Sequence, residues 1–144
     1  MQILGLTFDK ISIEMKNPLK GKLELKSNLK VEDITEQKLN ISDKPALKFD
    51  FSFSVNYDPN IAVVNLKGSL VALDNKNESK EILKEWKDKK FNHPSKIAIL
   101  NQIMNKCNIK AIQLEDEFNL PLHINLPKIK PASQKSSGPA NYTG

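Results

Sequence analysis

Few side chains of this 144-residue chain could carry out catalysis or hold a metal ion. It has two histidines, His93 and His123, and one cysteine, Cys107, with no Cys-x-x-Cys or His-x-x-x-His pair. Zinc and iron sites usually draw on such closely spaced ligands, so the sequence predicts no metal site. We expect both histidines to be structural or solvent-exposed, and Cys107 to act as a small buried apolar residue.

Acid–base chemistry would have to come from the carboxylate run Glu115-Asp116-Glu117. Nothing nearby in the sequence would shift the pKa values of these groups, so we interpret the run as the solvated end of a helix. The five glycines form neither a Gly-x-Gly-x-x-Gly nor a Walker pattern, which argues against a phosphate-binding loop. The sequence therefore predicts a protein that is not an enzyme and has no cofactor.

All 22 basic residues are lysines, and the formal net charge is +5. Lys128, Lys130 and Lys135 supply three of these charges in a C-terminal stretch without acids, so the rest of the chain is nearly balanced. Specific nucleic-acid binding usually relies on the planar guanidinium of arginine. We do not expect nucleic acid to be the main partner, although lysines can make nonspecific phosphate contacts.

Three features of the sequence bear on where in the cell the protein is found. No apolar run approaches the roughly 18 residues of a membrane span, so membrane insertion is not expected. The N-terminus has no basic segment before an apolar one, which argues against a signal peptide. A single cysteine cannot form an internal disulfide, which is typical of a reducing cytoplasm.

The first half of the chain alternates between apolar and polar residues with period two, which predicts four antiparallel strands. In the first strand the apolar residues change from even-numbered to odd-numbered positions at Asp9-Lys10, which indicates a β-bulge. The second strand has apolar residues inward and mostly lysines outward. Its inward residues are expected to be Leu19, Leu23, Leu25, Leu29 and Val31.

The third strand concentrates the aromatic residues on one face, with Phe49, Phe51 and Phe53 among them. A short turn at residues 58–60 predicts a hairpin with the fourth strand, residues 61–73. That strand has apolar residues on both of its faces and is expected to be central in the sheet. Gly68 is expected to mark a bulge or a close backbone contact.

A helical period follows the strands. Asn77 is expected to cap a first helix that runs to Phe91 and presents Trp86 on its apolar side. Pro94 suits the first turn of a second helix with a heptad stripe, which predicts a core helix over the sheet, or alternatively a seam to a partner subunit. The stripe comprises Ile97, Leu100, Met104, Cys107, Ala111, Leu114 and Phe118, and Ile99, Ile103 and Ile112 widen it toward a helix that covers a sheet.

These elements predict an α+β fold, in which a four-stranded antiparallel sheet is covered on one face by two C-terminal helices. Residues 1–130 are expected to form a single domain that ends in a proline-punctuated extended segment. Residues 131–144 are rich in proline, serine and glycine and are expected to be a disordered tail.

Three segments resemble the SecB-like family of protein-export chaperones. Residues 9–18 (DKISIEMKNP) resemble the first-strand signature, residues 64–70 (VNLKGSL) the glycine-containing strand before the helices, and residues 120–127 (LPLHINLP) the proline-rich segment after the long helix. The likeness spans roughly residues 3–130. The chain departs from the family where the second helix opens, because residues 93–97 (HPSKI) offer neither the aromatic residue nor the arginine usual there.

This resemblance implies an ATP-independent holdase that binds unfolded or non-native polypeptides, with protein export as one setting, and that assembles as a homo-oligomer, a dimer or a tetramer. Family members that dock on the SecA motor use an acidic sheet surface. The lysine-rich outward face of the second strand argues against SecA docking here. The implied groove for unfolded polypeptide draws on Phe49, Phe51, Phe53, Trp86, Leu120, Leu122 and Ile124.

Alternatives remain at this point. For the three phenylalanines, a plain core position between sheet and helices is the alternative to a groove. For the whole protein, a dedicated interaction module that binds one folded or acidic partner is the main rival to a general chaperone. Nonspecific RNA binding through the lysines is a third class, and it predicts a steep salt dependence.

Overall fold

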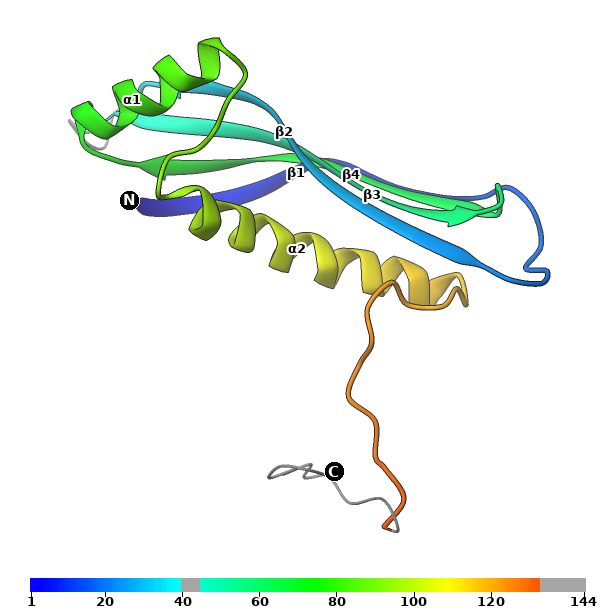
Figure 1. Ribbon diagram of the computed structural model, residues 1–144. Coiled ribbons are helices and arrows are strands. Elements are labelled where there is room, and N and C mark those ends of the chain that lie inside the picture. The colour runs from blue at the N-terminus through cyan, green and yellow to red at the C-terminus, as the bar shows by residue number, and fades with distance from the viewer. Residues whose placement is uncertain (40–44, 133–144) are drawn as a thin grey trace.

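The computed structural model describes residues 1–39 and 45–132 of the chain. Four strands form one antiparallel sheet in the order β1-β4-β3-β2, and two helices follow them in the sequence (Figure 1). The predicted α+β fold is confirmed, and the expected tail at 131–144 lies almost wholly outside the described residues. The elements are β1 (Gln2–Met15), β2 (Glu24–Gln37), β3 (Ala46–Asp58), β4 (Ala62–Leu73), α1 (Lys76–Lys87) and α2 (Lys96–Glu117).

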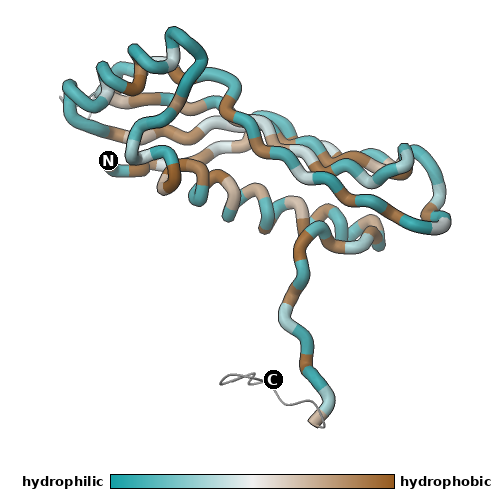
Figure 2. Tube along the Cα trace, in the orientation of Figure 1, coloured by the Kyte–Doolittle hydropathy of each residue, from teal (hydrophilic) through white to brown (hydrophobic). Residues whose placement is uncertain are grey.

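The central strands β3 and β4 form the predicted hairpin, in which Tyr57 pairs with Ala62 across the turn. Alternate residues of each strand point to one face of the sheet, and α2 lies along that face (Figures 1 and 2). Phe49, Phe51 and Phe53 belong to this buried face and are at most 2% exposed. The aromatic face of β3 is therefore the core of the domain, which was the alternative left open by the sequence.

The predicted bulge in β1 is present, because the register between β1 and β4 shifts between Phe8 and Lys10. A second shift lies between Ile3 and Gly5. Next to the first shift, Phe8 pairs with Gly68, and the Phe8 ring packs edge-on against Phe51 at 6.2 Å between centroids. The close backbone contact expected at Gly68 is confirmed, because a Cβ there would lie 2.2 Å from the carbonyl oxygen of Thr7.

Replacing Gly68 by alanine is expected to destabilise the domain by about 1–3 kcal/mol, the usual range for overpacking. The added methyl group meets backbone on β1 and the Phe51 ring, so relief requires the strand to shift. Gly5→Ala is the matched control, since a Cβ at Gly5 has nothing within 4 Å. Urea unfolding measures both variants, and equal midpoints would contradict this account of Gly68.

The helices differ from the sequence-based expectation at their ends. Asn75, not Asn77, caps α1, because its side chain accepts a hydrogen bond from the backbone N–H of Glu78 at 2.9 Å. The helix ends at Lys87, four residues before the predicted Phe91. Lys89 then adopts a left-handed conformation (φ 57°), which turns the chain toward α2.

The buried stripe of α2 also differs from the predicted heptad stripe. The helix buries every fourth residue, and the exposed fractions of Ile97 (72%) and Phe118 (39%) place both ends of the predicted stripe at the surface. Spacing by four drifts slowly around the helix, so the stripe of one helix can follow a twisted sheet. The residues that α2 buries are Ile99, Ile103, Cys107, Ala111 and Glu115.

The opposite face of the sheet is polar and carries both signs of charge. Lysines of β2 and β3 lie close to acids on the same face, with Lys30 3.8 Å from Glu32 and Lys48 3.7 Å from Asp50. The second strand begins at Glu24, so Leu19, expected to point inward, precedes it and is 43% exposed. Within the described chain, neither helix has the length and apolar content needed to cross a membrane.

Candidate functional site

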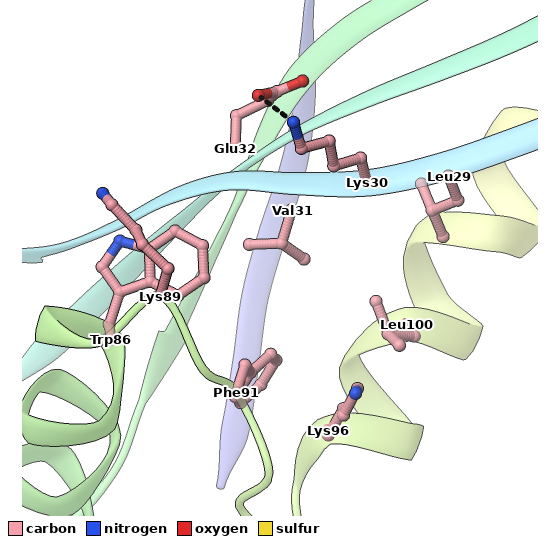
Figure 3. A pocket seen from close by; sticks show the side chains of 9 residues that line it. All are labelled: Leu29, Lys30, Val31, Glu32, Trp86, Lys89, Phe91, Lys96 and Leu100. Atoms are coloured by element: carbon pink, nitrogen blue, oxygen red, sulfur yellow. Dashed lines mark ion pairs between the residues drawn. The ribbon is translucent and has the colours of Figure 1, made fainter.

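A surface pocket of about 540 Å³ lies between the edge strand β2, the segment that joins α1 to α2, and the start of α2. Its apolar surface comes from three parts of the chain that are distant in sequence. Lysines and one glutamate complete its lining (Figure 3). We call this pocket the groove, and its residues are Leu29, Lys30, Val31, Glu32, Trp86, Lys89, Phe91, Lys96 and Leu100.

The alternation of β2 divides its residues between the two sides of the sheet. Figure 3 shows Leu29 and Val31 pointing into the groove, whereas Lys30 and Glu32 point to the other side of the strand. Leu29 and Val31 are only half-buried, so part of their apolar surface lines the open groove. Partial exposure of this kind leaves apolar surface that a second chain can cover.

Trp86 is held in place at one side of the groove. Its indole Nε1–H donates a hydrogen bond of 2.9 Å to Asp33, the residue after the bulge in β2. Phe91 lies between Trp86 and α2 and packs against Phe49 with ring centroids 5.5 Å apart. The groove wall is thereby anchored to the edge strand through Asp33 and to the core through Phe91.

The backbone of β2 adds a second binding feature to the groove. In the described part of the chain, β2 pairs with β3 on one side and has no strand on its other side. Four consecutive residues of this edge strand line the groove. An extended peptide could therefore pair its backbone with β2 while its alternate side chains enter the apolar pocket.

The structure brings the predicted binding-site residues together only in part, because Leu120 joins the three phenylalanines in the core cluster while the groove contains only Trp86 of the set. Trp86 lines the groove, but the three phenylalanines lie inside the core, where Phe49 reaches the groove only through its contact with Phe91. Leu120, Leu122 and Ile124 follow the far end of α2. Sequence reasoning missed Leu29, Val31, Phe91 and Leu100, although Leu29 and Val31 were placed on the inward face of their strand.

The end of α2 contains a buried polar cluster that the sequence did not predict. Glu115, expected on a solvated helix end, is fully buried, and its carboxylate lies 2.8 Å from Nδ1 of His123. Nε2 of His123 lies 2.8 Å from Oδ1 of Asn108, and its backbone N–H also donates to Glu115. Nδ1 of His123 thus faces the Glu115 carboxylate and Nε2 faces the side-chain amide of Asn108, so both ring nitrogens have a hydrogen-bond partner.

Tyr57 links this cluster to the sheet. Its hydroxyl donates a hydrogen bond to the carbonyl oxygen of Pro121, in the segment that follows α2. Burial and the nearby Glu115 carboxylate raise the pKa of Tyr57 above its usual value, so the phenol stays protonated and remains a donor. The cluster fastens the first residues after α2 against the sheet.

No three His, Cys, Asp or Glu side chains gather in a metal-binding arrangement within residues 1–39 and 45–132. Cys107 lies buried on α2, where loss of solvent raises the pKa of its thiol to about 12. A thiol with so high a pKa is a poor nucleophile at neutral pH. The groove, which combines open apolar surface with the edge of β2, is the candidate site, and its lining suits the binding of a peptide segment.

No family model matches the sequence, and no curated protein matches it significantly. Among solved structures, the chain is similar to the SecB-like chaperone Rv1957 of Mycobacterium tuberculosis, solved in complex with a ChAD peptide from the HigA1 antitoxin Rv1956. The match has a TM-score of 0.53 and 7% sequence identity, and it covers 90% of this chain and 89% of that one. The fold is SecB-like. The resemblance seen in the sequence is thus confirmed for the fold.

Proposed function

We propose that this SecB-like protein binds extended, apolar segments of other polypeptides in the groove and acts as an ATP-independent holdase without enzymatic activity. The observation that carries the proposal is the combination, in one place, of open apolar surface and an unpaired strand edge on β2. Extended chains offer both a free backbone and alternating side chains, so they can use both features at once. Folded proteins rarely expose such segments.

Holding an unfolded chain delays its aggregation by mass action, because the bound chain is withdrawn from the aggregating pool. The first test dilutes a denatured client into stoichiometric amounts of the protein without ATP and follows light scattering. We expect suppression that persists at about 0.5 M salt, since apolar contacts and buried backbone hydrogen bonds are weakly screened. Loss of suppression in salt would instead favour binding through the lysines, which is the salt dependence that nonspecific RNA binding would also show.

A dedicated partner is the second candidate function. The SecB-like neighbour was solved with a peptide from one antitoxin, which supports a role in which one peptide fills the groove. This candidate predicts tight binding of one sequence and no suppression of aggregation across several unrelated clients. A general holdase predicts suppression of most of them, so the same scattering assay separates the two.

We further propose that the protein works in the cytoplasm as a homo-oligomer, a dimer or a tetramer. Apolar side chains remain exposed on the edge strand β1, where Leu4 is 39% and Ile11 45% exposed. Both positions lie away from the groove lining, so self-association there leaves the groove open. A monomer mass in analytical ultracentrifugation at micromolar concentrations would contradict this assembly.

A further inference from the structure

Three lysines and one glutamate line the groove, but Lys30 and Glu32 pair with each other on the other side of β2, so Lys89 and Lys96 are the charged side chains on the groove side. We propose that the groove selects extended segments in which an apolar stretch is flanked by aspartate or glutamate. This inference rests on the proposed function and names the class of client within it. An unselective holdase needs only apolar surface, so the charged part of the lining is what distinguishes one apolar segment from another.

The two carboxylates of β2 beside the groove, Glu32 and Asp33, already have partners. Glu32 accepts a hydrogen bond of 2.6 Å from the Ser52 hydroxyl and lies 3.8 Å from the ammonium of Lys30. Asp33 accepts hydrogen bonds from the Trp86 indole and from the backbone N–H of Ile34. Glu32 is 45% exposed but lies on the side of β2 away from the groove, and Asp33 accepts from two donors, so the carboxylates of β2 place little free negative charge on the groove side.

The lysines of the groove are placed differently. Lys89 lies with its ammonium 5.1 Å from the centre of the Trp86 ring, and neither Lys89 nor Lys96 forms an ion pair with a carboxylate in the described part of the chain. Figure 3 shows Lys89 beside Trp86 and Lys96 beside Leu100, with Phe91 between them. Two unpaired ammonium groups thus flank the apolar floor.

The surrounding chain adds to this local excess of positive charge. Residues 76–96, which comprise α1 and the segment leading to α2, contain seven lysines and four acids. The rest of the chain, apart from its C-terminal stretch, is close to neutral. Like charges on the rim of an apolar cleft raise the local concentration of opposite charge and repel clients of the same sign. A client with acidic residues on both sides of its apolar stretch would meet Lys89 and Lys96 together.

The test compares three peptides that share one extended apolar core and carry Asp-Asp, Ser-Ser or Lys-Lys at each end. Trp86 is the only tryptophan, so its emission reports binding, with anisotropy of a labelled peptide as a second readout. At low salt we expect the acidic peptide to bind roughly 3- to 10-fold more tightly than the neutral one, and the basic peptide more weakly than both. At about 0.5 M salt the three affinities should converge.

The double variant Lys89→Glu with Lys96→Glu should reverse the order of the acidic and basic peptides. Lys67→Glu with Lys106→Glu makes the same change in net charge at exposed positions outside the groove and should preserve the wild-type order. If the wild-type protein binds none of the peptides, the proposed function itself fails. If it binds all three equally, or the basic one best, the proposed function stands and the selection for acidic flanks is wrong.

Discussion

Replacing His123 by alanine is expected to lower the free energy of unfolding by about 1–3 kcal/mol, the cost of leaving a buried polar group without its hydrogen-bond partner. The side chains of His123 and Glu115 are at most 2% exposed, so the substitution leaves a buried carboxylate without its main partner. Glu115→Ala removes the other half of the pair and strands the imidazole instead. Urea unfolding at one fixed protein concentration measures both variants, since oligomerisation would otherwise contribute.

The double variant His123→Leu with Glu115→Leu provides the critical comparison. Both buried polar side chains are then replaced by apolar ones, so it should recover a large part of the stability lost by either single variant. Asp116→Ala changes the exposed acid next to Glu115 and should alter stability by no more than about 0.5 kcal/mol. Single variants as stable as the wild type would show that the cluster does not fasten the segment after α2.

Replacing Leu100 by serine is expected to weaken binding of an extended apolar peptide by at least about tenfold. Leu100 supplies the α2 side of the groove, and burial of a leucine side chain is worth about 1.5–3 kcal/mol, where 1.4 kcal/mol corresponds to tenfold in affinity. Trp86 remains in place as the fluorescent reporter. The neutral peptide with serine flanks is the ligand, so that charge does not enter the comparison.

Ile109→Ser is the matched control for this variant. It removes a similar apolar side chain from the same helix, at a residue that is 58% exposed and outside the groove. Peptide affinity should change by less than about twofold, while the thermal midpoint verifies that both variants fold. Equal losses at Leu100 and Ile109, or a loss at Ile109 alone, would place the binding surface elsewhere on α2.

Most of the sheet could be predicted from the sequence because its signals are local. Period-two alternation in β3 and the short turn after it identify the central hairpin without any knowledge of the rest of the chain. The bulge in β1 was also readable, since a switch of apolar parity at Asp9 requires one extra residue if the same face is to stay buried.

The face of α2 could not be predicted in the same way. A heptad pattern and a pattern of every fourth residue both contain Cys107 and Ala111. The twist of the sheet decides which of the two patterns faces the core. The burial of Glu115 depends on His123, which lies eight residues further along and returns to the helix only through the turn after it. The spacing of apolar residues in the sequence gives no sign of such a contact between two side chains.

The groove depended even more on tertiary structure. Its walls come from β2, from the segment around Trp86 and Phe91, and from the start of α2. Trp86 was a candidate because the family resemblance implies an apolar groove and Trp86 lies on the apolar side of the predicted first helix. Leu29 and Val31 looked like ordinary core positions, and only the edge position of β2 leaves them half-exposed.

Hydrogen exchange of the protein with and without a bound unfolded client tests the central claim most directly. If an extended chain adds to the edge of β2, exchange of backbone amides should slow in β2 around Leu29–Glu32 and in the segment from Trp86 to Leu100. The segment after α2 and the polar face of the sheet should exchange as before. Protection confined to β1 or to residues 120–126, with the groove unchanged, would contradict the account.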